Sequence, residues 1–242
     1  MDNNYRLQML LDESFKRYGV FISHNDASIT TRHCMALRHE VFCVDKGFEP
    51  LSADGMEQDE YDPSSWHFLL VDKKKGCACG TARLIVGSDI PSKKFLSTED
   101  PYHPDQQNPL CVGEVSRIIL SSDYRRASRE SSPIMVLLLA LNYWALHIGL
   151  NKIYTCMEAG LLRMLQSIDG LSLMTIGERV EFRGVRQVAI ITAHDLLTKR
   201  MAYKNLPPES LDAEFSCYFK QQDDPGLPQE ELTSREVSIK TV

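Results

Sequence analysis

Near the middle of the chain stands the run Val112-Gly113-Glu114-Val115-Ser116-Arg117-Ile118-Ile119-Leu120, whose apolar residues predict a largely buried β-strand. This strand would carry two opposite charges, Glu114 and Arg117, among its apolar side chains. An ionised group inside a buried segment is tolerated only where it is paired or hydrogen-bonded. The run therefore predicts a polar pocket that is built into the sheet of the protein.

Further charges of both signs lie beside or inside other segments that are expected to be buried. Arg38 precedes Phe42 by four residues in an apolar helix, and Arg83 lies in an apolar strand. The acidic run Glu57-Gln58-Asp59-Glu60-Tyr61-Asp62 comes shortly before another apolar strand. Because each of these charges needs a partner, we expect them to meet the charges of the central strand in one shared pocket.

The spacing of the two charges in the central strand makes a specific demand on its shape. Glu114 and Arg117 are three residues apart, so a regular strand would direct them to opposite faces of the sheet. Both can reach one pocket only if the strand bends. A β-bulge between Val115 and Arg117 would bend it, and it would also free backbone N–H groups that could stabilise an oxyanion.

The segments before the central strand predict helices followed by a β-hairpin. A first helix with its apolar residues on one face is expected to end at Gly19. A second helix would hold Arg38 and Phe42 on a common face. The expected elements are helices over residues 5–18 and 29–43, strands over 20–22, 66–71 and 77–86, and polar segments over 47–65 and 87–110.

The segments after the central strand alternate between helix and strand. The pair Ser132-Pro133 predicts the start of a helix that is apolar nearly all round, so this helix should be buried at the centre of the fold. The pattern as a whole indicates a mixed α/β fold. The expected elements are helices over residues 134–148, 159–168 and 193–201, and strands over 152–157, 171–176, 180–183 and 187–192.

Length and composition indicate one large domain. The chain has 242 residues, of which 43% are hydrophobic, and this is enough for one full core with little left for a second. We expect this domain over residues 1–206, followed by a polar, proline-containing tail over 207–242. Phe215, Tyr218 and Phe219 could still dock that tail onto the domain.

Composition also indicates the cellular compartment of the protein and excludes some classes of partner. Seven scattered cysteines do not form a disulfide framework, and Cys77-Ala78-Cys79 is too closely spaced for the usual zinc knuckle. The first residues lack the pattern of a secretory signal, and the apolar stretch 134–141 is too short to span a bilayer. A net charge of −6 argues against nonspecific nucleic-acid binding. We expect a cytoplasmic protein with no metal site, no membrane span and no nucleic-acid partner.

Four motifs, in this order, resemble one group of enzymes. Over roughly residues 30–200 the chain is similar to the acyl-homoserine-lactone synthases, the N-acyl amino acid synthases and the acyltransferase-like proteins of exosortase systems. The resemblance implies a GNAT-like acyltransferase fold, whose central twisted mixed sheet is flanked by helices and splayed open to admit a thioester donor. The four motifs are Arg38-x-x-x-Phe42, Glu57-x-Asp59-x-x-Asp62, Gly80-Thr81-x-Arg83-Leu84 and Glu114-x-Ser116-Arg117.

One departure from this pattern bears on the acceptor. The lactone synthases carry a tryptophan six residues after the motif phenylalanine, whereas this chain has Phe48 there. The acidic run that ends in Trp66-His67-Phe68-Leu69-Leu70, together with Glu181-Phe182-x-Gly184, is more similar to the N-acyl amino acid synthases and exosortase-associated proteins. The resemblance therefore favours an amino acid over adenosylmethionine as acceptor.

Amide formation from a thioester needs a neutral amine, so a base must accept the proton of the attacking nitrogen. Glu114 is the first candidate, acting directly or through a water, because burial could raise its pKa toward neutrality. The alternative is that Glu114 is only the ion-pair partner of an arginine such as Arg38 or Arg117. The catalytic residues that we expect are Glu114 and Arg117.

The remaining motif residues are expected to bind substrate. Asp59 and Asp62 could hold the ammonium of the acceptor, or they could only pair with Arg38 or Arg83 and stabilise their loop. An arginine of the cluster could equally hold an acceptor carboxylate through two hydrogen bonds. The expected substrate-binding residues are Arg38, Phe42, Asp59, Asp62, Arg83 and Ser116.

The stretch 122–129 follows the central strand and contains no glycine. Arg125, Arg126 and Arg129 in this stretch would suit the phosphate of a phosphopantetheine arm and the acidic surface of an acyl carrier protein. The alternative is a solvated basic loop. Apolar residues of the central helix and of 161–165 could line an acyl tunnel, although such faces usually form core. These residues are Leu137, Leu138, Leu139, Leu141, Tyr143, Trp144, Leu161, Leu162 and Leu165.

Together these observations predict an N-acyltransferase. It would transfer a medium or long fatty acyl chain from acyl carrier protein to the amine of a small acceptor, an amino acid, with no metal or redox cofactor. Two alternatives remain open. One is an acyl-homoserine-lactone synthase that uses S-adenosylmethionine, and the other is a catalytically silent module that binds acyl carrier protein.

Overall fold

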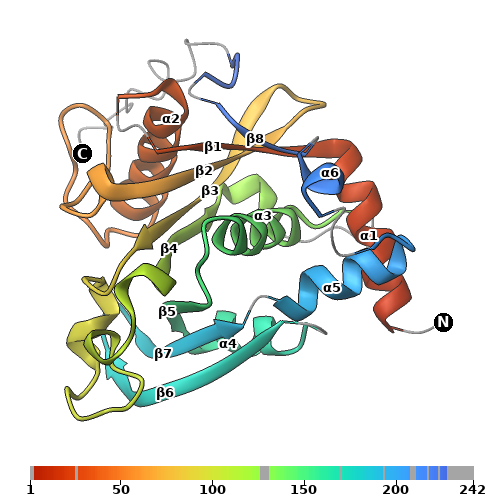
Figure 1. The fold of residues 1–242 in the computed structure, drawn as a ribbon. Coiled ribbons are helices and arrows are strands. Elements are labelled where there is room, and N and C mark those ends of the chain that lie inside the picture. Colours follow the sequence, from red (N-terminus) through yellow and green to blue (C-terminus); the bar gives the residue numbers. More distant parts are fainter. Residues whose placement is uncertain are drawn as a thin grey trace.

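The described strands of the protein form one sheet. The computed structural model describes residues 3–24, 27–125, 131–168, 171–192, 194–207, 211–216, 218–222 and 224–227. Its eight strands lie side by side in the order β6-β7-β5-β4-β3-β2-β1-β8, and helices cover the sheet (Figure 1). Antiparallel and parallel pairs both occur, so the expected mixed α/β fold is confirmed.

One half of the sheet is a regular antiparallel arrangement. The strand β4 (Val112–Leu120) coincides with the strand expected from the sequence, and it pairs antiparallel with β3. The turn between β2 and β3 is closed by Gly76, which donates its N–H to the carbonyl of Asp72 at 2.8 Å. The other strands of this half are β1 (Tyr18–Ser23), β2 (Ser65–Asp72) and β3 (Cys77–Val86).

The other half of the sheet separates from the first at the strand pair β4 and β5. The parallel pairing of β5 (Lys152–Glu158) with β4 covers only three residues of each strand, ending at Glu114 and Tyr154. Beyond these residues both strands continue without pairing to each other. The expected splay in the sheet is therefore present. On the far side β5 pairs antiparallel with β7 (Val185–Thr192), which pairs with β6 (Ser172–Glu181).

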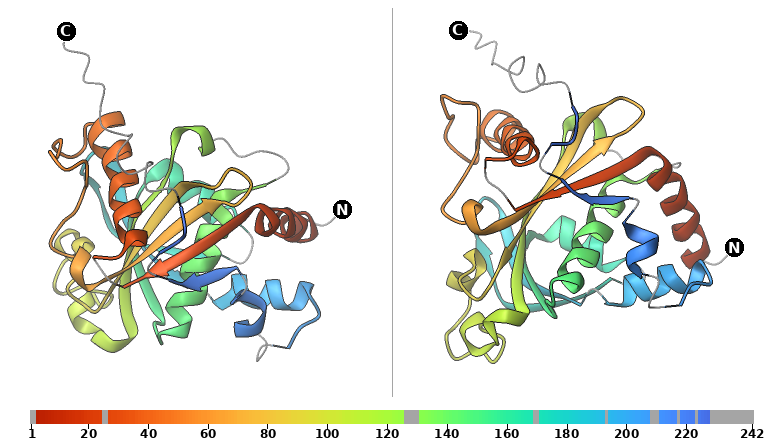
Figure 2. Two further views of the ribbon diagram at one scale, coloured as in Figure 1. Left: turned by 90° about the horizontal axis from the view of Figure 1, so that it is seen from above. Right: turned by 45° about the horizontal axis from the view of Figure 1, so that its top comes forward.

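Helices cover both faces of the sheet. The central helix α3 (Pro133–His147) is apolar nearly all round and packs on β1, β2 and β3, where Phe68 and Leu70 meet it. On the opposite face lies α2 (Ile29–Arg38), as the two views in Figure 2 show, and its Cys34 belongs to the same buried cluster as Leu69 of β2. The remaining helices are α1 (Asn3–Arg17), α4 (Ala159–Gln166), α5 (His194–Tyr203) and α6 (Leu211–Phe215).

Packing continues past residue 206. Phe215 and Phe219 are buried against α1 and α3, and Tyr218 stacks on Phe15 with ring centroids 4.4 Å apart. The short strand β8 (Phe219–Gln221) pairs parallel with β1 at the edge of the sheet. The segment expected to be a polar tail therefore contributes an edge strand and a helix to the main domain.

Two of the expected elements differ from the structure in their bounds. The first helix ends at Arg17, and Gly19 lies inside β1, where it pairs with Val71, so it does not end the helix. The two strands expected over 171–176 and 180–183 are one strand, because Gly177 bends it at a bulge with φ +63° instead of ending it. Among the described helices, none is long and apolar enough to cross a bilayer.

The second helix also differs, and this difference lies next to the site. After Arg38 the α-helix widens into a π-helix over His39–Asp45, so that Lys46 bonds to the carbonyl of Val41. The turn that separates Phe42 from Arg38 is therefore wider than an α-turn, yet both residues lie beside Arg117 and Glu57: Arg38 donates to Glu57, and the Arg117 guanidinium lies 5.6 Å from the centroid of the Phe42 ring. Such π-segments occur often at functional sites.

Candidate active site

The strand β4 bends where the sequence requires it. In its register with β3, Arg83 pairs with Ser116 and Thr81 pairs with Ile119, so β4 has one more residue in this interval than β3. Arg117 lies in the interval with φ +55°, a conformation that a residue other than glycine rarely adopts. The expected bulge is thus present at Arg117, and the pocket-lining side of β4 includes both Glu114 and Arg117.

Close approach of β3 also fixes the start of this strand. A Cβ added at Gly113 would lie 2.4 Å from the carbonyl oxygen of Ile85 and 2.9 Å from Leu150. A side chain at this position would therefore push β3 away from β4. The absence of a side chain at Gly113 keeps Glu114 at the point where the sheet opens.

A buried ion-pair cluster lies beside the bulge. The guanidinium of Arg38 is fully buried and donates two hydrogen bonds to the carboxylate of Asp62, at 2.7 and 2.9 Å. Its Nε donates to Glu57. This bidentate geometry is the most favourable one for an arginine and a carboxylate.

Arg83 and Arg117 complete the cluster from β3 and β4. Arg83 is fully buried and donates to Asp59, to Asp62 at 2.8 Å and to the hydroxyl of Ser116 at 3.2 Å. Arg117 donates to Glu57 at 2.7 Å and to Asp59 at 3.0 Å. Three arginines thus share three carboxylates, and the cluster carries no net formal charge. We call these six residues the paired cluster: Arg38, Glu57, Asp59, Asp62, Arg83 and Arg117.

Two carboxylates of the paired cluster, Asp62 and Glu57, have lowered pKa values. Burial alone would raise the pKa of Asp62, but hydrogen bonds and charges from Arg38 and Arg83 outweigh it and hold that pKa far below its usual range. The pKa of Glu57 is lowered in the same way, against its burial, by Arg117 and Arg38. At neutral pH both carboxylates are therefore ionised and satisfied.

His67 is a buried residue that lies beside the paired cluster. Its Nε2 is 3.1 Å from the backbone carbonyl of Asp62. Burial lowers its pKa to about 4, although Asp62 opposes that shift. The imidazole is therefore neutral at physiological pH.

Glu114 has a different environment from the other carboxylates. It is 2% exposed, and within the described part of the chain it forms no ion pair. Its partner is the backbone N–H of Ser92, which donates to Oε2 at 2.8 Å. Burial raises the pKa of Glu114, and the bond from Ser92 opposes the rise only in part. The alternative in which Glu114 is merely the ion-pair partner of Arg38 or Arg117 is therefore wrong.

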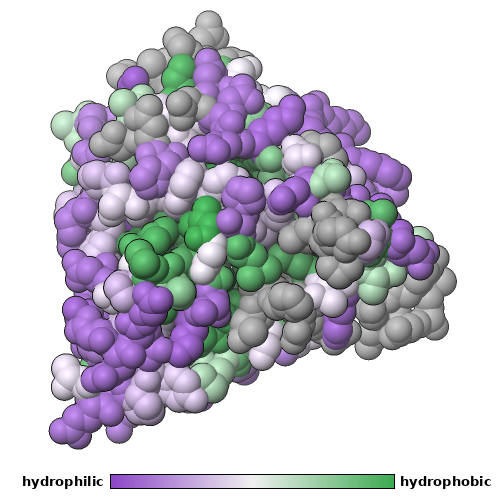
Figure 3. Space-filling model, in the orientation of Figure 1, coloured by the Kyte–Doolittle hydropathy of each residue, from purple (hydrophilic) through white to green (hydrophobic). Residues whose placement is uncertain are grey.

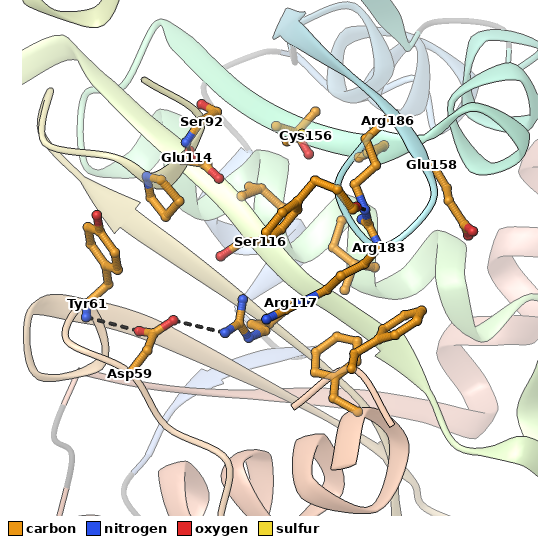
Figure 4. A pocket seen from close by; sticks show the side chains of 18 of the residues that line it. Asp59, Tyr61, Ser92, Glu114, Ser116, Arg117, Cys156, Glu158, Arg183 and Arg186 are labelled. Atoms are coloured by element: carbon orange, nitrogen blue, oxygen red, sulfur yellow. Dashed lines mark hydrogen bonds and ion pairs between the residues drawn. The ribbon is translucent and has the colours of Figure 1, made fainter. Parts of the chain in front are cut away.

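A cavity of about 470 Å³ opens between the separated strands. One wall comes from β4 and the other from β5, α4 and the turn between β6 and β7, and Figure 4 shows both. This volume falls in the range of small-molecule sites. The lining residues used below are Phe42, Phe48, Glu49, Asp59, Ser92, Lys94, Phe95, Glu114, Ser116, Arg117, Cys156, Met157, Glu158, Leu161, Phe182, Arg183 and Arg186.

The cavity divides the expected site residues into two groups. Phe42, Asp59, Glu114, Ser116 and Arg117 line it. The other three expected substrate-binding residues do not line the cavity and lie in the buried layer behind it. Their guanidinium and carboxylate groups bind one another within the paired cluster. They are Arg38, Asp62 and Arg83.

The structure describes one of the three expected donor-docking arginines, and it places one of the expected acyl-tunnel residues at the cavity. Arg125 pairs with Asp45 at 2.8 Å and donates to the carbonyl of Leu120. Arg126 and Arg129 lie outside the described residues. Of the apolar residues considered for a tunnel, Leu161 lines the cavity. The others are packed in the core or against it, namely Leu137, Leu138, Leu139, Leu141, Tyr143, Trp144, Leu162 and Leu165.

Several cavity residues were not expected from the sequence. Ser92 binds Glu114 through its backbone, so its side-chain identity gives no signal. Glu49 and Arg183 form an ion pair of 2.5 Å at the cavity, between segments far apart in the chain. Arg186 is the only charged residue of β7. This isolated charge is the one feature of the sequence that could have marked it as a site residue. Among the described residues no cluster of potential metal ligands was found.

Comparison with known proteins supports the fold. Residues 37–132 match the family model described as an acetyltransferase (GNAT) domain, and no curated protein matches the chain. This segment contains the whole paired cluster together with Glu114.

Solved structures with the same fold include several acyl-homoserine lactone synthases. BjaI, a CoA-dependent synthase solved with SAM and isopentyl-CoA, superposes with a TM-score of 0.62 at 18% identity, over 90% of this chain and 98% of BjaI. The synthase LasI gives 0.54 at 19% identity, over 73% and 88% of the two chains. The CoA-dependent synthase MesI gives 0.56 at 16%, over 78% and 96%. Residues 37–132 therefore resemble a GNAT acetyltransferase domain, and the chain has the fold that is seen in the acyl-homoserine lactone synthases.

Proposed function

We propose that this protein is an N-acyltransferase that moves a medium or long acyl chain from acyl carrier protein to the amine of an amino acid. The observation that carries the proposal is the environment of Glu114. A buried carboxylate with a raised pKa, which forms no ion pair with any arginine that the structure describes, lies where the sheet opens and faces the cavity. This is the environment that a general base near neutral pH needs.

The proposed reaction is a single acyl transfer. The nitrogen of the acceptor attacks the thioester carbonyl carbon, the new C–N bond forms, and the C–S bond breaks to release the thiol of the carrier. Glu114 accepts the proton that the nitrogen loses, directly or through a water. The thioester itself supplies the activation of the acyl group.

The bulge in β4 supports stabilisation of the oxyanion. At a bulge the ladder of hydrogen bonds is interrupted, so backbone N–H groups become available on the bulged strand. The bulge at Arg117 lies three residues from Glu114, on the same cavity wall. We infer that these N–H groups bind the developing negative charge on the thioester oxygen.

The shape of the site supports a thioester donor with an acyl chain. The parallel strands separate just after Glu114, which leaves an opening between β4 and β5. Apolar side chains of Phe42, Phe48, Met157 and Leu161 line the cavity beside it. We assign the apolar lining to the acyl chain. The segment between β4 and α3, which holds Arg125, Arg126 and Arg129, is our proposed docking site for the carrier.

Asp59 is the acidic member of the paired cluster that remains accessible from the cavity. Its side chain is 19% exposed, whereas Asp62 is 2% exposed. We propose that Asp59 orients the ammonium of the acceptor, and that Asp62 only stabilises the loop.

All described cysteines are free, which agrees with the proposed cytoplasmic location.

The test is a product assay with the purified full chain. Long-chain acyl carrier protein and, separately, acyl-CoA are incubated with a mixture of amino acids, and acyl amides are followed by mass spectrometry. Glu114→Gln should abolish the product. Glu178→Gln removes an exposed carboxylate of β6 away from the cavity and is the matched control.

Other outcomes separate the alternatives. A lactone together with methylthioadenosine, formed when S-adenosylmethionine is added, would show that the protein is a lactone synthase. Binding of acylated carrier without any product would identify a silent binding module. Amide formation that Glu114→Gln leaves unchanged would refute the role of Glu114 and keep the reaction.

A further inference from the structure

Four cationic side chains line the cavity, and they differ in how far protein carboxylates satisfy them. Arg117 is bound by Glu57 and Asp59. Arg183 is bound by Glu49 at 2.5 Å. The other two, Lys94 and Arg186, form no ion pair with any described residue. Unpaired cations that face a cavity are the groups that remain available to a ligand.

Arg186 is held in place without its charge being neutralised. Its Nε donates to the backbone carbonyl of Phe182 at 2.8 Å, which fixes the side chain near the turn between β6 and β7. This bond leaves the two terminal nitrogens of the guanidinium free. Figure 4 shows the Arg186 side chain reaching from its strand toward Arg183.

The carboxylate that faces Arg186 across the strand pair does not form an ion pair with this guanidinium. Glu158 pairs with Arg186 in the register of β5 and β7, yet the two side chains form no ion pair. Glu158 is exposed, and in Figure 4 its carboxylate lies off to the side. The position beside the terminal nitrogens of Arg186 is therefore open to a carboxylate from outside the protein.

Arg186 and the proposed base line the same cavity. Cys156 of β5 lines the cavity between the two walls, and it is two residues before Glu158 on the same face of its strand. Burial raises the pKa of the Cys156 thiol to about 11. The charge of Glu114 adds to this shift, while Arg186 and Lys94 oppose it. These four residues, Lys94, Glu114, Cys156 and Arg186, all line the same cavity.

We propose that Arg186, assisted by Lys94, binds the carboxylate of the acceptor while Glu114 receives the proton from its amine. The acceptor class is then a small molecule that bears both an amine and a carboxylate, whether a free amino acid or S-adenosylmethionine. This inference rests on the proposed function for the assignment of the amine. A planar guanidinium with two free nitrogens matches a carboxylate by paired hydrogen bonds.

The test uses binding as well as turnover, so that it does not depend on activity. Calorimetry compares an N-acyl amino acid, which has the carboxylate of the product, with its carboxamide, which lacks that charge. The wild-type protein should bind the acid about tenfold to a hundredfold more tightly than the amide. Arg186→Gln should remove this preference and leave binding of the amide unchanged, and Arg186→Lys should restore part of it.

Turnover then separates the sources of the carboxylate and the role of the arginine. Free amino acid, amino acid amide and S-adenosylmethionine are compared as acceptors, and Arg186→Gln should raise KM for the acids without changing KM for the acyl donor. Arg179→Gln, an exposed arginine of β6, is the matched control and should change neither quantity. A shift in donor KM would reassign Arg186 to the donor phosphate and overturn the proposal.

The two hypotheses fail in different ways. Preference for the acid without amide formation would refute the proposed reaction and support the carboxylate site. Amide formation with equal use of acids and amides, or a preference that survives in Arg186→Gln, would refute the carboxylate site and leave the reaction standing. Failure of the wild-type protein to bind either acyl compound would also refute the site.

Discussion

Both walls of the cavity contain cationic side chains, but those of one wall are paired with carboxylates and two of those on the other wall are not paired with any described carboxylate. On the β3 and β4 side, the three arginines of the paired cluster meet three carboxylates, and Arg38 and Arg83 are fully buried. Facing it, the β5 and β7 side holds Arg186 and Lys94 without carboxylate partners among the described residues. Hydrophilic residues cover much of the face shown in Figure 3, whereas hydrophobic ones gather near its centre.

This difference shows how charged residues at one cavity can serve different purposes. A buried ion pair costs desolvation, and removing one partner leaves an uncompensated charge, so the paired cluster primarily fixes the shape of the wall. An unpaired cation at a cavity has no such structural use. Glu114 lies on the β4 wall, yet it forms no ion pair with any described arginine, so it belongs to the second type.

The strongest test of this comparison is Glu114→Gln. We expect a loss in the rate of acyl transfer of roughly 10²- to 10⁴-fold, because the amide cannot accept a proton. The global fold should persist, since the variant removes a buried charge without leaving an unpaired cation. Single-turnover kinetics measure the rate, and circular dichroism checks the fold. A variant that keeps the wild-type rate would contradict the assignment of Glu114 as base.

Arg38→Met tests the paired cluster. Removing this guanidinium leaves Asp62 and Glu57 buried with fewer partners, so the free energy of unfolding should fall by about 3–5 kcal/mol. Urea denaturation gives that quantity. The matched control is Arg125→Gln, which breaks the ion pair with Asp45, where both side chains are more than one-third exposed. The control should cost about 0–1 kcal/mol. Equal losses in the two variants would remove the distinction between buried and exposed pairs.

The two kinds of carboxylate should respond to pH with opposite signs. The pKa of Glu114 is raised in the folded state, so ionised Glu114 destabilises the fold. The wild-type protein should therefore lose stability relative to Glu114→Gln as pH rises above the ordinary value of 4.5 and through the raised pKa. Below that window the difference between the two proteins should not depend on pH.

For Asp62 the sign reverses, because its folded-state pKa is lowered. The wild-type protein should be more stable than Asp62→Asn at neutral pH. This advantage should shrink as pH falls below the ordinary value of 3.8 and through the lowered pKa. Unfolding curves recorded between about pH 1 and pH 8 would measure both series. Two curves that slope in the same direction would mean that the carboxylates share one environment.

The fold could be predicted where local patterns and tertiary contacts agree. The strand Val112–Leu120 was predicted with its correct bounds, because its apolar residues and its two charges both require a place in a buried sheet. The π-helix after Arg38 could not be predicted, because the apolar spacing of 29–43 suits an α-helix equally well. The single strand Ser172–Glu181 was divided in two because Gly177 resembles a turn residue in sequence, whereas here it forms a bulge.

The sequence could predict which residues belong to the site, but it could not predict how they are arranged around the cavity. The motifs identified the members of the paired cluster, yet they could not show that Arg38 and Arg83 lie behind the cavity wall. That placement depends on which carboxylate each guanidinium reaches, and Asp62 binds both. Arg186 could not be identified because its role follows from the partner that it lacks. Such a lack becomes visible only when the neighbouring side chains are placed.

The smallest expected effect comes from the ion pair that connects the two walls. Glu49, in the segment after the π-helix, binds Arg183 in the turn between β6 and β7, and these side chains are 19% and 29% exposed. Because water reaches both groups, Arg183→Gln should lower the free energy of unfolding by at most about 1 kcal/mol, and added salt should reduce that loss. Denaturation at low and high ionic strength measures it. A loss as large as that of Arg38→Met and independent of salt would mean that this pair behaves like the buried pairs of the paired cluster. The distinction between a rigid wall and an accessible wall would then not hold for the residues at the rim of the cavity.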